Sequence, residues 1–183
     1  TVVPDTFGIP ESRRFYALIS YEQGPIAIND ITHGLLYQTW VMRWNPATGV
    51  ITVTAETTLQ EVILQTILGL VSIAFTFDQA GRISYTYTTA VSSYLYWYDT
   101  ALAGFVTTDI GADCITPALL LDDKRSTQNT RNDMLLWYTK LSEGGLYELY
   151  MRRQRDRFLI ETLMGSGLPY AYLHNIGMHN GLR

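Results

Sequence analysis

A repeated pattern of short strands is the feature of this sequence that most restricts its fold. Between Ile73 and Ile110, four stretches alternate aromatic or apolar with polar residues, and turn sequences separate them. Residues 117–163 show the same order of stretches. The corresponding residues are Asp78 with Asp122, Tyr87 with Tyr138, Tyr96 with Tyr147, and Phe105 with Phe158, at offsets of 44, 51, 51 and 53 residues. Alternation with period two predicts strands, so each run predicts one unit of four antiparallel strands.

A third, fainter copy precedes these two. Residues 17–24 parallel residues 74–81, and residues 44–53 parallel residues 98–107. Units of four strands that recur every ~45 to 55 residues are typical of β-propeller blades. We therefore expect an all-β fold of three repeated four-stranded antiparallel units, arranged as a partial β-propeller or a stacked-sheet sandwich.

The run that begins at Tyr94 indicates that both faces of a unit are covered. Tyrosines 94, 96 and 98 share one face of this predicted strand, and Leu95 and Trp97 share the other. Both faces are apolar enough to be buried, as expected for a sheet stacked between two neighbours.

The domain organisation follows from the repeat. We expect an N-terminal arm over residues 1–12, one β domain over residues 13–164 with units at about 13–56, 72–110 and 116–164, and a C-terminal arm over residues 165–183. Propellers typically have at least four blades, so three units leave sheet faces that need cover. Apolar arms without turn-limited strands often dock on a neighbouring subunit.

Residues 59–68 fit two descriptions. Thr58 and Glu61 form a capping-box pattern, and apolar residues recur from Leu59 to Leu70 at helical spacing. Four β-branched residues between positions 62 and 67 favour strands instead. We expect strands here, with a short helix as the alternative.

Composition excludes several classes of protein. Charged residues make up 16% of the chain, below the roughly 25% of a typical soluble domain, and 47% of the residues are apolar. Apolar content this high excludes intrinsic disorder. The net charge of -4 argues against nucleic-acid binding driven by overall charge.

Cysteine and leader patterns indicate the compartment. Cys114 is the only cysteine, so no internal disulfide or cysteine-ligated zinc site is available, and a single thiol suits a reducing cytoplasm or a particle assembled there. The first residues lack the basic flank and apolar core of a signal peptide. Polar residues interrupt the longest apolar stretch, residues 62–77, so we expect no membrane insertion.

The sequence offers few candidates for chemistry. Asp78 and the pair Asp122–Asp123 could serve as paired carboxylates for glycoside hydrolysis, but their recurrence at one place in the repeat favours a turn role. Residues 165–167 lack the outer spacing of a nucleophile elbow. The three histidines, His33, His174 and His179, are interpreted as loop residues. We expect no catalytic residue, no metal site and no cofactor.

A basic cluster near the C-terminal end is the candidate interface. Eight of the thirteen Lys and Arg residues lie between positions 124 and 157. On a strand, Arg153, Arg155 and Arg157 would point to one face, where three guanidinium groups need counter-charges. We expect an ion-paired edge or subunit interface there, with a polyanion site as the alternative. Tyr170 and Tyr172 of the C-terminal arm are assigned to the same interface.

The many tyrosines and tryptophans have a second interpretation, a carbohydrate-binding platform. Aromatic residues at strand spacing are more often part of a core, and both faces of the Tyr94 run are occupied. A lectin-like module is therefore the alternative to a structural role.

Three sequence features together resemble a known class of protein. They are residues 21–27 (Tyr-Glu-Gln-Gly-Pro-Ile-Ala), the two turns that run from an Asp to an Arg, and residues 154–158 (Gln-Arg-Asp-Arg-Phe). The pattern over residues 15–183 resembles small structural proteins from the tails of tailed bacteriophages, such as tail nozzles, tips and collars. In these proteins, propeller-like or sandwich β units assemble in rings around the tail axis. A full nozzle subunit is several times longer, so the resemblance implies an accessory ring, collar, tip or fibre-attachment component.

The resemblance implies a non-enzymatic virion protein, homo-oligomeric, that mediates virion assembly or host adsorption. Its expected partners are copies of itself and other tail proteins, with a host surface glycan as a further candidate and nucleic acid not expected. The expected location is the virion, assembled in the host cytoplasm. A carbohydrate-binding module is the second hypothesis, and a glycan-degrading enzyme on a partial propeller is the third.

Overall fold

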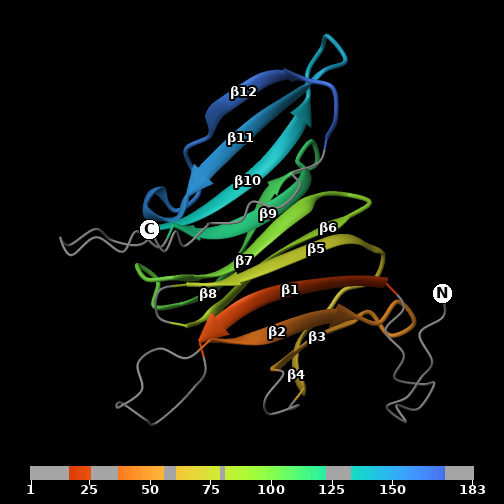
Figure 1. Ribbon diagram of the computed structural model, residues 1–183, viewed down its shortest axis with the longest axis vertical. Coiled ribbons are helices and arrows are strands. Elements are labelled where there is room, and N and C mark those ends of the chain that lie inside the picture. The colour runs from red at the N-terminus through yellow and green to blue at the C-terminus, as the bar shows by residue number, and fades with distance from the viewer. Residues whose placement is uncertain (1–16, 26–36, 56–60, 79–80, 123–132, 172–183) are drawn as a thin grey trace.

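The computed structural model describes residues 17–25, 37–55, 61–78, 81–122 and 133–171, which form three four-stranded sheets (Figure 1). Sheet 1 contains β1 (Ala17–Pro25), β2 (Tyr37–Trp44), β3 (Val50–Ala55) and β4 (Glu61–Thr66). Sheet 2 contains β5 (Leu70–Phe77), β6 (Ile83–Thr89), β7 (Ser93–Asp99) and β8 (Gly104–Gly111). Sheet 3 contains β9 (Ile115–Asp122), β10 (Asp133–Leu141), β11 (Tyr147–Arg153) and β12 (Thr162–Leu168). A 3₁₀ helix, η2 (Gln154–Asp156), separates the last two strands.

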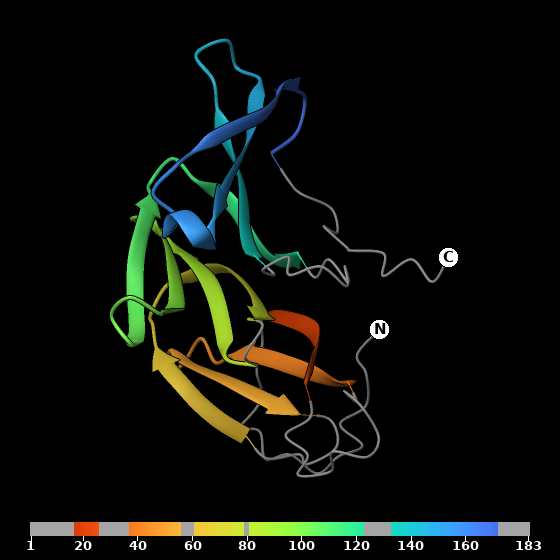
Figure 2. The ribbon, with the colours of Figure 1, turned by 90° about the vertical axis from the view of Figure 1, so that its left-hand side faces the viewer.

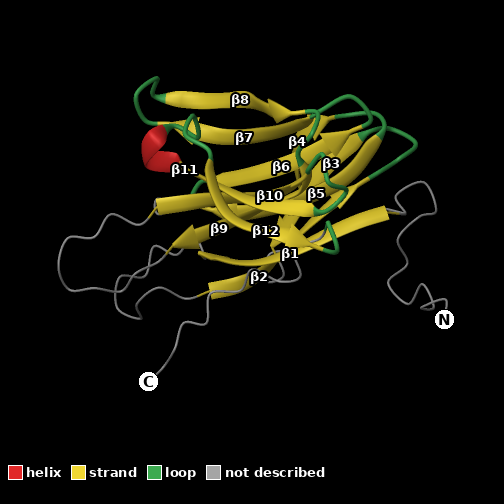
Figure 3. Ribbon diagram, turned by 90° about the horizontal axis from the view of Figure 1, so that it is seen from above, coloured by secondary structure: helices red, strands yellow, loops and turns green. Residues whose placement is uncertain are grey.

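Each sheet is an antiparallel meander in which consecutive strands are neighbours. The sheets are stacked in chain order, with sheet 2 in the middle, and overlie one another when seen from above (Figure 3). The first strands approach most closely, since β5 lies against both β1 and β9. Away from these first strands the sheets spread apart (Figure 2). The prediction of an all-β fold with stacked four-stranded antiparallel units is confirmed.

Tight turns separate the strands where the sequence carries turn residues. Asn45 closes the β2–β3 turn, because its carbonyl accepts from Gly49 N at 2.7 Å and its side chain accepts from Ala47 N at 3.0 Å. Asp78 closes the β5–β6 turn by accepting from Arg82 N at 2.9 Å. The interpretation of Asp78 as a turn residue is confirmed.

The core consists of two clusters, one on each side of sheet 2. The first lies between sheets 1 and 2 and includes Met42, Ile51, Phe75 and Tyr85. The second lies between sheets 2 and 3 and includes Leu95, Trp97, Met134, Leu136 and Tyr138. The face assignment along β7 is confirmed, since Leu95 and Trp97 enter the second cluster while Tyr94 and Tyr96 pack on the first.

Two predicted boundaries differ from the observed sheets. The first unit was expected to end at residue 56, but β4 extends sheet 1 to Thr66. The boundary was missed because the apolar residues of this segment recur at helical as well as strand spacing. The expectation of a strand rather than a helix within residues 59–68 is confirmed for residues 61–66. The C-terminal arm was expected from residue 165, but β12 runs to Leu168, because irregular pairing with β11 accommodates its two glycines. The N-terminal arm, residues 1–12, lies outside the described residues.

The predicted correspondence of Phe105 with Phe158 is also wrong. Phe105 lies on β8 and is 44% exposed, whereas Phe158 precedes β12 and is 1% exposed. Arg157 and Phe158 both have positive φ angles, 54° and 57°, so the chain bends after η2 and turns this ring inward. There it meets Trp97 edge-on at a centroid distance of 5.0 Å.

Within the described residues, no helix is long and apolar enough to cross a membrane.

Phe158 therefore contributes to stability through burial between sheets 2 and 3. We expect Phe158→Ala to lower the free energy of unfolding by about 3–5 kcal/mol, because it opens a cavity against Trp97. Phe105→Ala should cost only about 1 kcal/mol, the usual contribution of an exposed aromatic pair. Urea unfolding of both variants measures the difference, and equal losses would contradict the assignment.

Candidate assembly surface

The three arginines of the predicted interface do not share one strand face. Arg153 is the last residue of β11, Arg155 lies in η2, and Arg157 follows in the left-handed region. The prediction of an arginine row on one strand is wrong, because the strand ends where the row would begin. The positive φ of Arg157 then turns the chain away from the direction of β11.

Two of these arginines pair with carboxylates of the same chain. Arg155 Nε lies 2.9 Å from Asp133 Oδ2, and Arg155 N donates to Asp133 Oδ1 at 3.0 Å. Arg157 donates two hydrogen bonds to Asp99 Oδ2, one from Nε at 3.0 Å and one from Nη2. Because Asp99 ends β7 and is buried, this second pair ties sheet 3 to sheet 2. These two guanidinium groups stabilise the fold and have their counter-charges within the chain.

Arg153 belongs to a different surface, the forward face of sheet 3. We call the side of a sheet that points toward the next sheet in the chain its forward face, and the opposite side its rear face. Met134, Leu136 and Tyr138 of β10 point to the rear, into the core with sheet 2. The alternate residues of β10 therefore point forward, and the strand register adds their partners on β9 and β11.

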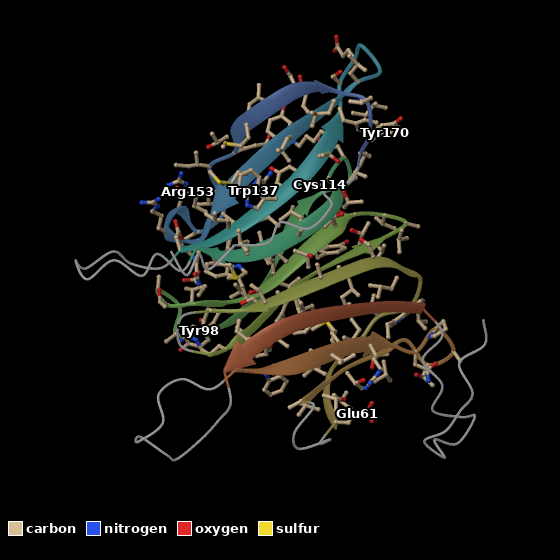
Figure 4. The ribbon with its side chains drawn as sticks, viewed as in Figure 1. Glu61, Tyr98, Cys114, Trp137, Arg153 and Tyr170 are labelled. Carbon is tan, nitrogen blue, oxygen red and sulfur yellow. The ribbon has the colours of Figure 1, made fainter. Side chains whose placement is uncertain are left out.

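The forward face of sheet 3 is mostly apolar. Its residues are Ala118, Leu120, Leu135, Trp137, Thr139, Leu149, Met151 and, at one corner, Arg153. Trp137 and Arg153 are marked in Figure 4 on this upper sheet. None of the twelve described strands packs on this face, since β9 meets β5 and β6 on its rear side. The chain after β12 touches one end of it, where Ala171 O accepts from Thr116 Oγ1 at 2.8 Å.

The rear face of sheet 1 lies at the other end of the stack and is more polar. By register it carries Val41 and Arg43 of β2 with Thr52 and Thr54 of β3. Arg43 Nη1 donates to Thr54 Oγ1 at 3.3 Å. Figure 4 marks Glu61 at this end of the stack, on the lowest sheet. The two ends of the stack thus differ, one apolar and one rich in threonine.

The two predicted interface tyrosines lie beyond β12. Tyr170 is 66% exposed in the segment that leaves the strand. Tyr172 lies outside the described residues.

A row of aromatic rings crosses the outer part of sheet 2 on its rear face. Tyr96 stacks on Tyr85 at 4.8 Å and on Phe105 at 5.1 Å, with an angle of only 6° between the planes of the Phe105 pair. Tyr98 meets the Phe105 ring edge-on, and Arg82 lies 3.8 Å above Tyr98. Because β8 is the edge strand, Phe105 ends the row and is 44% exposed.

A polar cluster that the sequence did not reveal centres on Glu161, just before β12. Arg152 Nη2 lies 3.0 Å from Glu161 Oε2, Lys140 Nζ lies 3.1 Å from Oε1, and the buried Tyr138 hydroxyl donates to Oε2. Lys140 Nζ also lies 3.1 Å from Asp113 Oδ2, in the segment that joins β8 of sheet 2 to β9 of sheet 3. The cluster therefore links these two sheets at the surface. Its members come from the segment between β8 and β9, from β10, from β11 and from the residue before β12, so only the tertiary fold brings them together.

The electrostatics of this cluster favour a structural role. Burial raises the pKa of the Tyr138 phenol, and its hydrogen bond to Glu161 raises it further. Burial also raises the pKa of the nearby Cys114 thiol to about 12, so at neutral pH this thiol is protonated. Neither group is poised to act as a base or a nucleophile near pH 7.

The other candidates for chemistry remain apart. The side chains of Asp122 and Asp123 and all three histidines lie outside the part of the chain that the structure describes. Residues 165–167 lie within β12 and make no elbow. Over the described ranges, no group of three or more His, Cys, Asp or Glu side chains could hold a metal ion.

Comparison with family models, with curated protein sequences and with solved structures yields no match.

The pKa of Glu161 makes stability depend on pH. Burial alone would raise this pKa, but hydrogen bonds from Tyr138, Arg152 and Lys140 outweigh it and hold the pKa below its usual value. The ionised carboxylate thus stabilises the fold above the unfolded pKa of about 4.3, and this contribution is lost as the pH falls through the folded pKa. Between about pH 5 and pH 3, urea unfolding should show a larger loss of stability for the native chain than for Glu161→Gln.

Glu143→Gln, in the exposed β10–β11 turn, is the matched control and should follow the native profile. Parallel profiles for the native chain and Glu161→Gln would show that the carboxylate contributes nothing.

Proposed function

We propose that this chain is a non-enzymatic structural component of a tailed phage particle. It is an oligomeric, tail-associated ring, tip or fibre-attachment protein that mediates virion assembly or host adsorption. Its partners are copies of itself and other tail proteins, and it is located in the virion, assembled in the host cytoplasm.

The observation that carries the proposal is the apolar forward face of sheet 3. Leu120, Leu135 and Trp137 occupy positions that, in sheets 1 and 2, pack against a following sheet. Among the described residues, no further sheet follows. Leu120, Leu135, Trp137 and Leu149 are partly exposed on this face, while Met151 and Thr139 are buried. Contiguous exposed apolar surface on soluble proteins usually marks a site of association. A stack of blade-like sheets that ends in such a face suits a subunit of a larger ring.

The wedge shape of the stack supports the same role. The first strands of the sheets lie close together, and the sheets spread apart away from them. Further sheets stacked in the same orientation relative to one another would therefore curve around an axis. Tail components assemble around an axis, and the resemblance noted in the sequence implies propeller-like units arranged in that way.

Location in the particle is tested by immunogold electron microscopy. Antibodies raised against the purified chain should label the tail of particles produced by the phage that encodes it. Particles without label, from a preparation in which the antibody recognises the denatured chain, would overturn the proposal.

Self-association gives a second test. We expect the full chain to sediment as a species larger than 20.8 kDa, because the forward face of sheet 3 is apolar. Leu149→Glu places a charge on this face at β11 and should weaken association, since a desolvated charge at an interface is unfavourable. Val91→Glu, in an exposed turn of sheet 2, is the matched control.

Circular dichroism of both variants establishes that they remain folded. A stable 20.8 kDa monomer of the native chain would contradict the oligomeric part of the proposal.

Carbohydrate binding is the second candidate, and the aromatic row on sheet 2 favours it. Exposed rings such as Phe105, with Tyr98 and Arg82 beside them, can stack on the apolar face of a sugar ring. Saccharide-specific binding on a glycan array that is lost in Phe105→Ala would favour this candidate.

A further inference from the structure

The three sheets are stacked by one repeated step. β5 lies against β1, and β9 lies against β5, so the first strand of each sheet meets the first strand of the next. Each step also places the forward face of one sheet on the rear face of the following sheet. After two steps, the forward face of sheet 3 and the rear face of sheet 1 are the two faces on which none of the described strands packs. A third step would need a rear face to cover sheet 3.

The strand register shows which residue of sheet 3 corresponds to Trp97 of sheet 2. Tyr94 of β7 and Tyr150 of β11 occupy the same position in their sheets, since each pairs with the repeated tyrosine of the second strand. Trp97 and Arg153 follow three residues later. Both point forward, Trp97 into the core with sheet 3 and Arg153 onto the forward face of sheet 3. Arg153 therefore occupies the position of Trp97.

The junction of sheets 2 and 3 shows what a residue at this position meets. Trp97 meets Phe158 edge-on at a centroid distance of 5.0 Å, and Asp99, the end of the same strand, pairs with Arg157. Both partners lie in the connection between β11 and β12, the third and fourth strands of the following sheet. A third step would therefore bring Arg153 to the connection between the third and fourth strands of another sheet.

In sheet 1, Glu61 stands at that connection. It is the first residue of β4, the fourth strand, and it pairs in register with Thr54 of β3. Because Ile51 and Val53 of β3 point forward into the core, Thr54 and Glu61 point to the rear. The rear face of sheet 1 thus carries a carboxylate where the repeated step would place a guanidinium group.

These two charges have no other partner among the described residues. Arg153 is partly exposed and Glu61 is exposed, and neither side chain takes part in an ion pair or a hydrogen bond there. Arg155 and Arg157, by contrast, pair with carboxylates of their own chain. Figure 4 marks Arg153 on the upper sheet and Glu61 on the lowest, so the two cannot meet within one copy.

Apolar residues accompany the carboxylate on the rear face of sheet 1. Ile63 pairs with Thr52 and points to the rear, where it is 69% exposed. Val41 of β2 lies on the same face and is partly exposed. The face therefore offers apolar contacts to Leu135 and Trp137, as well as one charge opposite to that of the forward face.

We propose that the forward face of sheet 3 binds the rear face of sheet 1 in a second copy of this chain, with Arg153 paired to Glu61 of that copy. An interface between two different faces is head-to-tail, and it closes into a ring when the rotation permits. Propellers typically have four to eight blades, so two copies of three sheets each close a ring of six. The inference rests on the self-association in the proposed function, and it adds the surface that the apolar face binds.

Charge reversal in the full chain tests the contact. The native chain should sediment at about twice the 20.8 kDa of one copy. Arg153→Glu and Glu61→Arg should each weaken self-association at least about tenfold, because each places like charges opposite one another. The double variant should restore it. An equimolar mixture of the two single variants should also restore it, since every contact then joins opposite charges.

Glu143→Arg, in the exposed β10–β11 turn, is the matched control for Glu61→Arg and should leave self-association unchanged. Circular dichroism of every variant should match that of the native chain. If Arg153→Glu weakens self-association and Glu61→Arg does not, the apolar face binds a different surface, which overturns this inference and leaves the proposed function standing. Failure of both the double variant and the mixture to restore self-association would overturn the pairing, and a species of three or more copies would overturn closure by two. A monomeric native chain would contradict the self-association itself.

Discussion

The structure depends on the burial of both faces of sheet 2. This sheet has apolar side chains on two sides, so its stability depends on cover from sheets 1 and 3. Sheet 2 meets this requirement fully, with Phe75 and Tyr85 on one side and Leu95 and Trp97 on the other. Segments of only three residues join β4 to β5 and β8 to β9, so each new sheet lies directly on the one before it.

The same requirement explains why the functional hypothesis concerns assembly. Stacking covers both faces of sheet 2 but only one face of sheets 1 and 3. The outer face of sheet 3 is more apolar than the outer face of sheet 1. Residues that would complete a ring must come from beyond the described strands. The interface that we propose is formed by side chains of β9, β10 and β11, and of the three arginines only Arg153 lies on that face.

Much of the fold could be predicted because its signals are local. Alternation along residues 94–98 and the turn at Asp78 depend on neighbours in the sequence, and the structure confirms both. The arginine row could not be predicted, since the end of β11 depends on backbone angles at Arg157 and on the distant Asp99. The Glu161 cluster was missed for a similar reason, because the fold brings together residues up to 48 positions apart: Asp113 and Glu161, both outside the strands, each pair with Lys140. The hydrogen bond from Thr139 could not be predicted either, because its acceptor, Ala171 O, belongs to a residue 32 positions away.

The two junctions of the stack have different chemistry. Sheets 1 and 2 meet mainly through aromatic and aliphatic side chains, whereas sheets 2 and 3 are also joined by the Asp99–Arg157 pair and the cluster around Glu161. Apolar contacts weaken on cooling, and ion pairs weaken as salt screens them. Cold therefore weakens the apolar contacts of both junctions, whereas high ionic strength weakens only the additional ion pairs of the second, so rising salt should make the two junctions more alike in strength.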